Sequence, residues 1–375
     1  MHDGLLTVGT GRPAPPPAPR RSLFDVLIVI YTVAVMAAAV LASVMVYRAI
    51  RGPAAPAAAP TSALAARIDP GLVDVTATLG YQHAISSGTG MVLTPSGRVI
   101  TNNHVIEGAT SITVTDVGNH RIYTAAVVGY DQGQDIAVLQ LAGASGLKTL
   151  PLSTSPAVTV GETVLALGNA QGQGGNPAAA TGVVTAVGQS IIATDQAEGL
   201  SGQLTGMIQT SVPLQPGDSG GPLVSPAGQV IGMNTAGSAQ FQIGSGVVQG
   251  FAIPASQAAP VAAAIAAGRA SAAVHIGATA FLGVQVVSYR VLAPGNPASP
   301  GAGVAGITPG TPAAKAGLVP GDVITSIGGH AVTSATSLRS VLNAYHPGQA
   351  ASLHWVGQAG QAHTATIIFA AGPAG

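Results

Sequence analysis

The chain has 375 residues, a formal net charge of zero and only 7% charged residues. At about 150 residues per domain, this length allows two folded domains with connecting segments. The neutral charge balance gives no reason to expect a nucleic acid or an acidic partner. The absence of cysteine excludes disulfides, thiol catalysis and cysteine-ligated metals, and it leaves the cellular compartment undecided.

The N-terminal part of the chain changes composition between two segments. Residues 1–25 begin Pro- and Arg-rich and cannot bury a core, so we predict a disordered cytoplasmic N-terminus. Residues 26–47 carry no charge, and as a helix they would extend about 33 Å, enough to cross a hydrocarbon core of roughly 30 Å. We predict an uncleaved transmembrane helix here. A cleaved signal peptide is the alternative, although its apolar stretch is usually about 7–15 residues long.

Orientation of this anchor follows only weakly from charge, because arginines flank both of its ends. The next segment, residues 48–68, is rich in Ala and Pro, which predicts a semi-stiff linker.

The segment of residues 69–268 contains many short β-type runs separated by Gly, Pro, Asn or Asp. Such runs without a long amphipathic helix predict an all-β barrel or sandwich. Residues 255–267 predict a helix at its end, stopped by Gly268.

A second, smaller domain is predicted over residues 278–371, after a linker at residues 269–277. Its helical runs lie near residues 312–316 and 334–344, among strands, which indicates an α+β domain. We find no internal repeat.

The strongest chemical motif is Gly-Asp-Ser-Gly-Gly-Pro-Leu at residues 217–223. A serine hydroxyl is a poor nucleophile alone, so Ser219 needs a base and a site for the developing oxyanion. Gly217 allows a sharp turn that directs two backbone N–H groups, its own and that of Ser219, into one concavity. A Gly-rich surface turn is the alternative, and the full seven-residue match argues against it.

The predicted base is His104, in the block Thr-Asn-Asn-His-Val-Ile at residues 101–106 at the end of a β-run. The other eight histidines lack such a context. No His-Glu-x-x-His pattern occurs, so we expect no metal, and no nucleotide or organic cofactor is implied either.

The third member should be a carboxylate that orients the imidazole, and the chain offers Asp131 and Asp135. Asp135 directly precedes the apolar run 136–139, where it can be partly buried and aimed, whereas Asp131 is expected to be solvated in a turn. We therefore prefer Asp135. The order His, Asp, Ser along the chain is that of the chymotrypsin architecture.

These motifs, with further blocks in the same order, resemble the HtrA/Deg family of membrane-anchored bacterial proteases over roughly residues 85–370. The further blocks lie at residues 87–93, 135–139, 167–169, 208–210, 230–235 and 250–254. The resemblance implies a mainly β protein: a chymotrypsin-like double β-barrel protease domain followed by a smaller α+β PDZ domain. It also implies His104 as general base, Asp135 as its orienter and Ser219 as nucleophile, with the N–H groups of Gly217 and Ser219 binding the oxyanion.

The resemblance further implies substrate contacts at Leu214, Met233 and Asn234. Leu214 falls where the family has an apolar residue near the primary specificity pocket, which suggests small or medium aliphatic residues before the scissile bond. The sequence departs from the family at two places: residues 211–212 are Ser-Val where Asp-Ala is usual, and Asp218 replaces the usual asparagine.

The Gly-rich stretch at residues 168–176 is predicted to be an active-site loop by the same resemblance. A phosphate loop is the alternative, but no Gly-Lys-Ser/Thr follows and no βαβ unit surrounds the stretch.

In the C-terminal domain, Phe281-Leu282-Gly283-Val284 looks like the carboxylate-binding loop of a PDZ domain, and residues 312–324 resemble the family's PDZ segment. The backbone N–H groups of Leu282, Gly283 and Val284 would capture a peptide C-terminus while the peptide pairs with the sheet edge. Gly317 is expected to cap a short helix.

We therefore expect a serine endopeptidase that cleaves unfolded or damaged proteins, anchored in the cytoplasmic membrane by one span with both domains outside the cytoplasm. Relatives in this family often form trimers, so a homotrimer is one expected assembly. Two alternatives remain at this point: an ATP-independent chaperone or PDZ scaffold with little proteolysis, and a soluble protease secreted after cleavage of the apolar segment.

Overall fold

The computed structural model describes residues 59–154, 157–195, 200–237, 249–288 and 301–375. The predicted N-terminal segment and transmembrane helix lie outside these residues. Within them, no helix has both the length and the apolar character needed to span a bilayer.

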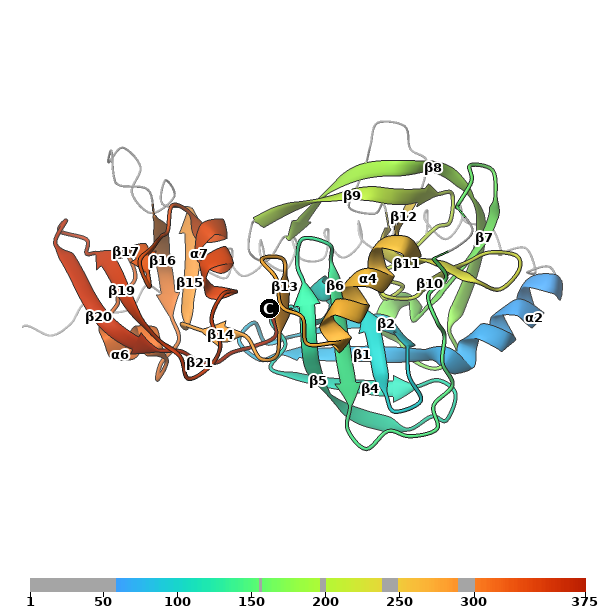
Figure 1. The fold of residues 1–375 in the computed structure, drawn as a ribbon, viewed down its shortest axis with the longest axis horizontal. Coiled ribbons are helices and arrows are strands. Elements are labelled where there is room, and N and C mark those ends of the chain that lie inside the picture. The colour runs from blue at the N-terminus through green and yellow to red at the C-terminus, as the bar shows by residue number, and fades with distance from the viewer. Residues whose placement is uncertain (1–58, 155–156, 196–199, 238–248, 289–300) are drawn as a thin grey trace, which may run out of the picture. The chain divides into compact units, whose positions relative to one another are not determined.

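The first half of the predicted protease domain is an antiparallel sheet in the order β13-β5-β4-β1-β2-β3-β6, and β5 also pairs with β6 (Figure 1). This extra pairing closes six of the seven strands into a ring. Apolar and polar side chains alternate along its strands. In β4 the side chains of Ile112 and Val114 are buried, while Ser111 and Thr113 are exposed. The strands are β1 (Leu72–Leu79), β2 (Ala84–Val92), β3 (Arg98–Thr101), β4 (Ser111–Asp116), β5 (Ile122–Asp131), β6 (Ile136–Leu141) and β13 (Val274–Ile276).

The second half is a closed barrel in the order β10-β11-β12-β9-β8-β7 (Figure 1). Closure leaves no unpaired sheet edge. The chain therefore has the predicted double-barrel architecture of a trypsin-like domain. The strands are β7 (Thr163–Gly168), β8 (Ala178–Asp195), β9 (Leu200–Thr210), β10 (Pro222–Val224), β11 (Val230–Gly237) and β12 (Gly250–Pro254).

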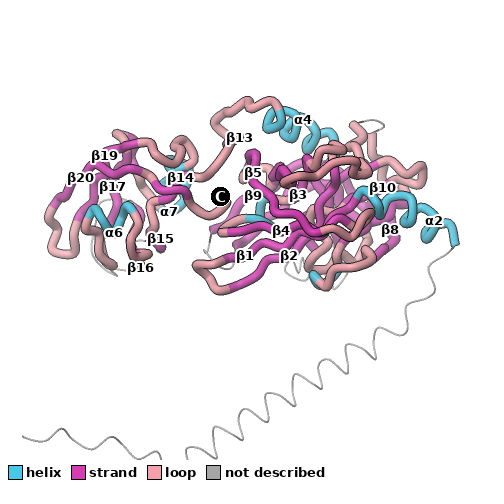
Figure 2. The backbone as a smooth tube through the Cα atoms, turned by 90° about the horizontal axis from the view of Figure 1, so that it is seen from below, coloured by secondary structure: helices cyan, strands magenta, loops and turns pink. Residues whose placement is uncertain are grey.

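Helix is confined to short segments in the described part of this domain (Figure 2). The helix predicted before Gly268 is observed as α4, and Gly268 has the left-handed φ of 66° expected where a helix stops. The helical segments are α2 (Ala59–Ile68), the 3-10 turn η1 (Asp69–Gly71), α3 (Asn103–Ile106), the 3-10 turn η2 (Ala170–Gly172) and α4 (Ala255–Ala266).

Two segments predicted as linkers are partly packed onto this domain. In the first, residues 48–68, the last ten residues form α2, and Ala65 and Ile68 are buried in the main core cluster. In the second, residues 269–277, the strand β13 pairs with β5. Apolar side chains explain both cases. Burial of Ile68 and Val274 against the domain removes apolar surface from water, which stabilises the packed arrangement over an exposed linker.

The C-terminal domain has a core of its own around Ile324, Leu353 and Trp355. Its main sheet runs β15-β16-β17-β19-β20, with β18 beside β17 and a separate pair β14–β21. The strands are β14 (Ala280–Phe281), β15 (Val284–Ser288), β16 (Ala302–Ile307), β17 (Val323–Ile327), β18 (His330–Ala331), β19 (Ala350–Val356), β20 (Ala362–Ile368) and β21 (Ala370–Ala371).

Both predicted helices of this domain are present, as α6 (Pro312–Ala316) and α7 (Ala335–Leu342). Gly317 caps α6 in the left-handed conformation, at φ 89°, as the sequence predicted. Ser334 begins α7 with a reciprocal capping box to Ser337, which satisfies backbone donors of its first turn.

Candidate active site

The candidate nucleophile, Ser219, lies in the turn between β9 and β10 and is partly exposed. Gly217 and Gly220 flank it with φ values of 98° and 86°, which L-residues with a side chain rarely adopt. A side chain at Gly217 would clash with the carbonyl oxygen of Asn169, and one at Gly220 with that of Thr89. The glycines of the motif are therefore required both by backbone conformation and by close packing.

His104 and Asp135 form the pair that the sequence predicted. The His104 ring Nδ1 lies 2.8 Å from Asp135 Oδ2, and the His104 backbone N–H donates to Asp135 Oδ1 at 2.9 Å. The side chain of Asp135 is 10% exposed and that of His104 46%. An Nδ1–H donated to the carboxylate is the tautomer that leaves Nε2 able to accept a proton.

The backbone of Asp135 is itself held in an unusual conformation, with φ 56°. Its carbonyl oxygen accepts a 3.0 Å hydrogen bond from the side-chain amide of Asn102, which lies two residues before His104. A left-handed non-glycine residue costs free energy and persists where its surroundings over-determine it. Here the segment that contains Asn102 and His104 holds Asp135 in this conformation, through hydrogen bonds to its carbonyl oxygen and its carboxylate.

Thr235 connects the His104–Asp135 pair to the nucleophile, and the sequence did not single it out. Its hydroxyl donates to Asp135 Oδ2 at 2.6 Å, while its backbone carbonyl accepts from Ser219 Oγ at 2.8 Å. The three residues predicted for catalysis therefore belong to one hydrogen-bonded network. The only sequence signal was the block that ends at Thr235, which gave no reason to separate a buried hydroxyl from ordinary strand residues.

The rejected carboxylate, Asp131, is not solvated as predicted; it is 1% exposed. Its two oxygens accept from the backbone N–H and the side-chain amide of Gln134, at 3.0 and 3.1 Å. Burial raises the pKa of Asp131, and these bonds oppose the rise. Asp131 stabilises the turn from which Asp135 points at the imidazole.

The predicted substrate contacts are placed less favourably. Met233 and Asn234 are fully buried, and the Asn234 amide donates to the carbonyl oxygen of Pro222 at 3.0 Å. Their side chains pack in the barrel interior, so the predicted contact with substrate would fall to their backbone groups. Leu214 is 7% exposed and packs in the second barrel's core cluster, against Gly250.

The Gly-rich stretch predicted as an active-site loop lies against the nucleophile turn. The backbone N–H of Gln171 donates to the carbonyl oxygen of Pro216 at 2.6 Å, and Gly172 N–H donates to Asn169 O at 2.8 Å. The first of these bonds joins the loop to the nucleophile turn, in addition to the close approach at Gly217, and the second lies within the loop.

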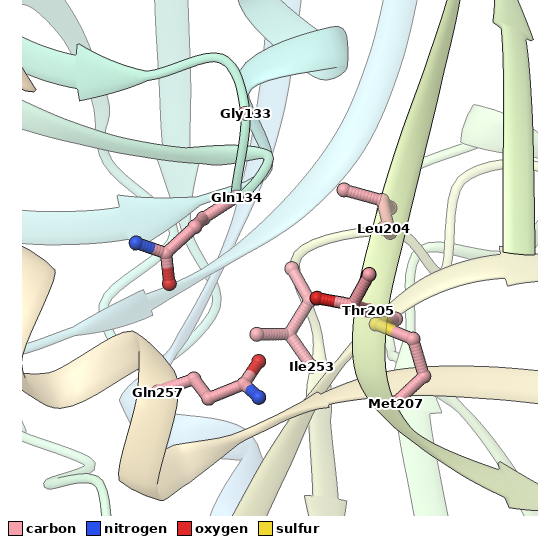
Figure 3. Close-up of a pocket in the computed structure, with 7 residues that line it drawn as sticks. All are labelled: Gly133, Gln134, Leu204, Thr205, Met207, Ile253 and Gln257. Atoms are coloured by element: carbon pink, nitrogen blue, oxygen red, sulfur yellow. The ribbon is translucent and has the colours of Figure 1, made fainter. Parts of the chain in front are cut away.

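A cavity of about 180 Å³ lies beside the turn that carries Asp135. Figure 3 shows the amides of Gln134 and Gln257 extending toward the space between them, with apolar side chains on its other wall. Its lining residues are Gly133, Gln134, Leu204, Thr205, Met207, Ile253 and Gln257. None of the predicted catalytic or substrate-contacting residues is among them.

Asp218, which precedes the nucleophile, is a buried carboxyl group with an unusual environment. It is 7% exposed, and Oδ2 accepts from the Gln215 N–H at 2.8 Å, while Oδ1 is buried without a hydrogen-bond partner. Burial raises the pKa of Asp218 from 3.8 to about 6, and the bond from Gln215 only partly opposes it. The charged form is therefore disfavoured in the folded state.

Replacement of Asp218 by Asn is expected to stabilise the protein at pH 7.5 by about 2 kcal/mol. The raised pKa means that stability is lost as pH increases from about 4 to above about 6, where Asp218 ionises in a buried site. The gain from asparagine should accordingly vanish at pH 4. Urea unfolding at the two pH values measures it, with Asp131→Asn as a control that removes one of two used acceptors and should not stabilise. An equal gain at both pH values would contradict this explanation.

In the C-terminal domain, the predicted carboxylate-binding residues connect β14 to β15. Leu282 is buried, and Gly283 has φ 84° and no room for a side chain beside Thr311. Their carbonyl oxygens accept from Ala313 N–H and Thr308 N–H, both at 2.9 Å. These bonds fix the loop from the carbonyl side.

Two family models match the chain: a trypsin-like peptidase domain at residues 88–233 and a PDZ domain at residues 280–357. Serine protease PepD of Mycobacterium tuberculosis is 32% identical, over 84% of this chain and 69% of its own length. Periplasmic serine endoprotease DegP of Salmonella typhimurium is 33% identical, over 72% of this chain and 54% of its own length. The solved structure of HtrA-type protease AlgW with tripeptide is 30% identical and covers 84% of this chain and 97% of that one, with a TM-score of 0.46.

Two barrels followed by a PDZ domain, with the serine motif in the second barrel, define a trypsin-like serine endopeptidase with a PDZ domain. The chain belongs to the HtrA/DegP family of serine proteases. It spans about half to two thirds of the length of the curated relatives it matches.

Proposed function

We propose that this protease hydrolyses peptide bonds of unfolded or damaged proteins outside the cytoplasmic membrane, using Ser219, His104 and Asp135. The observation that supports the assignment best is the network through Thr235, whose hydroxyl meets Asp135 and whose carbonyl meets Ser219. It connects residues that lie far apart in the sequence, and this supports their assignment to one nucleophile, base and orienting carboxylate.

In the proposed reaction, Ser219 Oγ attacks the substrate carbonyl carbon while His104 Nε2 takes the hydroxyl proton. The tetrahedral oxyanion is bound by the N–H groups of Gly217 and Ser219. The C–N bond then breaks as His104 returns the proton to the leaving amine, and water hydrolyses the acyl-enzyme by the reverse proton path. Because Ser219 Oγ–H donates to Thr235 O here, the hydroxyl must turn toward the imidazole before attack.

Asp135 stabilises the imidazolium that forms in this step. It does so with both oxygens occupied, by the ring Nδ1 and the backbone N–H of His104 and by Thr235 Oγ1. A carboxylate with this many donors keeps its position through the cycle.

Membrane anchoring by residues 26–47 and peptide C-terminus capture by Leu282, Gly283 and Val284 complete the proposal. The uncharged apolar run supports the anchor. The location is supported by relatives that are named periplasmic serine endoproteases. Capture by the PDZ loop is supported by the fixed backbone around Gly283.

The proposal is tested by fluorophosphonate labelling of the full chain, followed by peptide mapping. We expect a single labelled peptide with the phosphonate on Ser219, and loss of casein cleavage in proportion to labelling. Pre-incubation with a cleavable aliphatic peptide should slow labelling. A chain that does not react, yet suppresses aggregation of a denatured protein, would instead be the chaperone or scaffold considered above.

A further inference from the structure

Thr89, in β2, contacts the nucleophile turn through both its backbone and its side chain, and it is 1% exposed. Its hydroxyl donates to the carbonyl oxygen of Gly217 at 2.7 Å, across a separation of 128 residues. Its backbone N–H donates to the carbonyl oxygen of Ser219 at 2.8 Å. One residue of the first barrel therefore holds two carbonyl groups of the turn that carries the nucleophile.

These two carbonyls lie in alternation with the N–H groups proposed to bind the oxyanion. The peptide that contains the Ser219 N–H joins residues 218 and 219, and it lies between the peptides 217–218 and 219–220 whose carbonyls Thr89 holds. A peptide unit is planar, so fixing the planes on both sides restricts the plane between them. The direction of the Ser219 N–H thus depends on Thr89.

The hydroxyl of Thr89 also accepts a hydrogen bond, from the backbone N–H of Asn169 at 2.8 Å. Asn169 lies in the predicted active-site loop, and its carbonyl oxygen fits against Gly217. A hydroxyl can donate and accept at once, which a valine of the same shape cannot do. Removing it leaves the Asn169 N–H and the Gly217 carbonyl, both buried, without this partner.

Thr89 is anchored in turn by a second buried hydroxyl. Thr101, at the end of β3 and three residues before His104, donates from Oγ1 to the Thr89 carbonyl oxygen at 2.7 Å. The backbone of Thr89, from which its hydroxyl projects, is therefore fixed by the sheet of the first barrel.

We propose that Thr89 is a positioning residue that holds the oxyanion-binding turn in the conformation where the N–H groups of Gly217 and Ser219 converge. It acts through the backbone and does not touch the substrate. This inference rests on the proposed function, because it assigns Thr89 a part in the reaction of Ser219.

The test compares kcat and KM of full-length Thr89→Val, Thr89→Ser and wild type on a fluorogenic peptide with an aliphatic residue before the scissile bond. Loss of one direct oxyanion donor costs about 10²–10³-fold in kcat, so a disordered donor should cost about 10–100-fold. We expect that loss in Thr89→Val, with KM within about threefold of wild type, and near-normal kcat in Thr89→Ser. Phosphonylation by a fluorophosphonate, which forms a similar tetrahedral adduct, should slow in parallel.

Thr210→Val is the control that distinguishes the proposed positioning role of Thr89 from a purely structural one. Thr210 is equally buried, and its hydroxyl also donates to a carbonyl, that of Gly250 at 3.4 Å, and accepts from an N–H, that of Val212 at 3.2 Å. This variant should lower the denaturation midpoint much as Thr89→Val does, but keep kcat within about threefold of wild type. The acid limb of the pH–rate profile should be unchanged in both, because neither residue contacts His104 or Asp135.

Should Thr89→Val not fold, Thr89→Cys provides the second variant, because a thiol is a weaker donor and a weaker acceptor than a hydroxyl. Its kcat should lie clearly below that of Thr89→Ser, and equality of the two would overturn the inference. So would a Thr89→Val enzyme whose kcat is no lower than that of Thr210→Val. Hydrolysis retained in Ser219→Ala would refute the proposed function itself, whereas an inactive Ser219→Ala beside a fully active Thr89→Val refutes only the role of Thr89.

Discussion

Ser219→Ala is expected to lower casein hydrolysis by about 10⁵–10⁶-fold, the scale seen when a protease nucleophile is removed. The hydroxyl makes one hydrogen bond in the free protein, to the carbonyl oxygen of Thr235, and the residue is only partly buried. Its removal leaves one backbone carbonyl without this donor, so the fold should survive. Initial rates on casein and far-UV circular dichroism measure the two effects.

Ser225→Ala is the matched control for this substitution. Ser225 lies six residues beyond Ser219 and directly after β10, and its Oγ accepts from the Gln229 N–H at 3.3 Å. We expect it to cleave casein at the rate of the unmodified protein, within about twofold, because no step of the proposed mechanism involves it. Equal activity in Ser219→Ala and Ser225→Ala would show that another group is the nucleophile.

Asp135→Asn is expected to lower kcat by about 10⁴-fold with a much smaller change in KM, as in other enzymes with this triad. Asparagine offers one acceptor where the structure uses two oxygens. If its oxygen keeps the bond from the His104 backbone N–H, its NH₂ group faces the imidazole Nδ1 and the Thr235 hydroxyl. The imidazole then holds its proton on Nε2 and cannot accept one from Ser219.

The neighbouring Asp131→Asn separates this tautomer effect from damage to the turn. Asp131 is also buried, and each of its oxygens accepts a hydrogen bond from Gln134 instead of from the imidazole. We expect it to lower stability while keeping kcat within about threefold of the unmodified enzyme. Steady-state kinetics at pH 8 with urea unfolding of the same samples decide this, and a comparable loss of kcat in both variants would assign the effect to the turn alone.

Much of the site could be predicted because its local conformation is encoded by adjacent residues. Gly217 and Gly220 require left-handed backbone, and no other residue type fits there. The helix stop at Gly268 and the cap at Gly317 follow from the same property. A conformation that depends on one residue and its chain neighbours can therefore be predicted from the sequence alone.

Burial was predicted less well, because it depends on what the rest of the chain places above a residue. Asp131 was expected in solvent and is buried. The side chains of Met233 and Asn234 are also fully buried, and their contact with substrate stays a prediction. The segment preceding Asp69 was expected to be a tether, and its helix α2 contributes Ile68 to the core. The errors at Asp131 and in the segment before Asp69 arose because local composition does not show which distant parts of the chain pack against a residue.

The sequence by itself determined which chemistry this protein can perform, through a nucleophile motif, a histidine block and a carboxylate in a recognisable order. Only the tertiary structure decided which buried hydroxyls lie beside these groups: Thr235, which is bonded to Asp135 and Ser219, and Thr89, which joins β2 to the nucleophile turn. The reason is physical. A threonine in a β-strand has no distinctive local signature, and the partners of Thr235 and Thr89 lie 100 and 128 residues away, brought together only when the two barrels form.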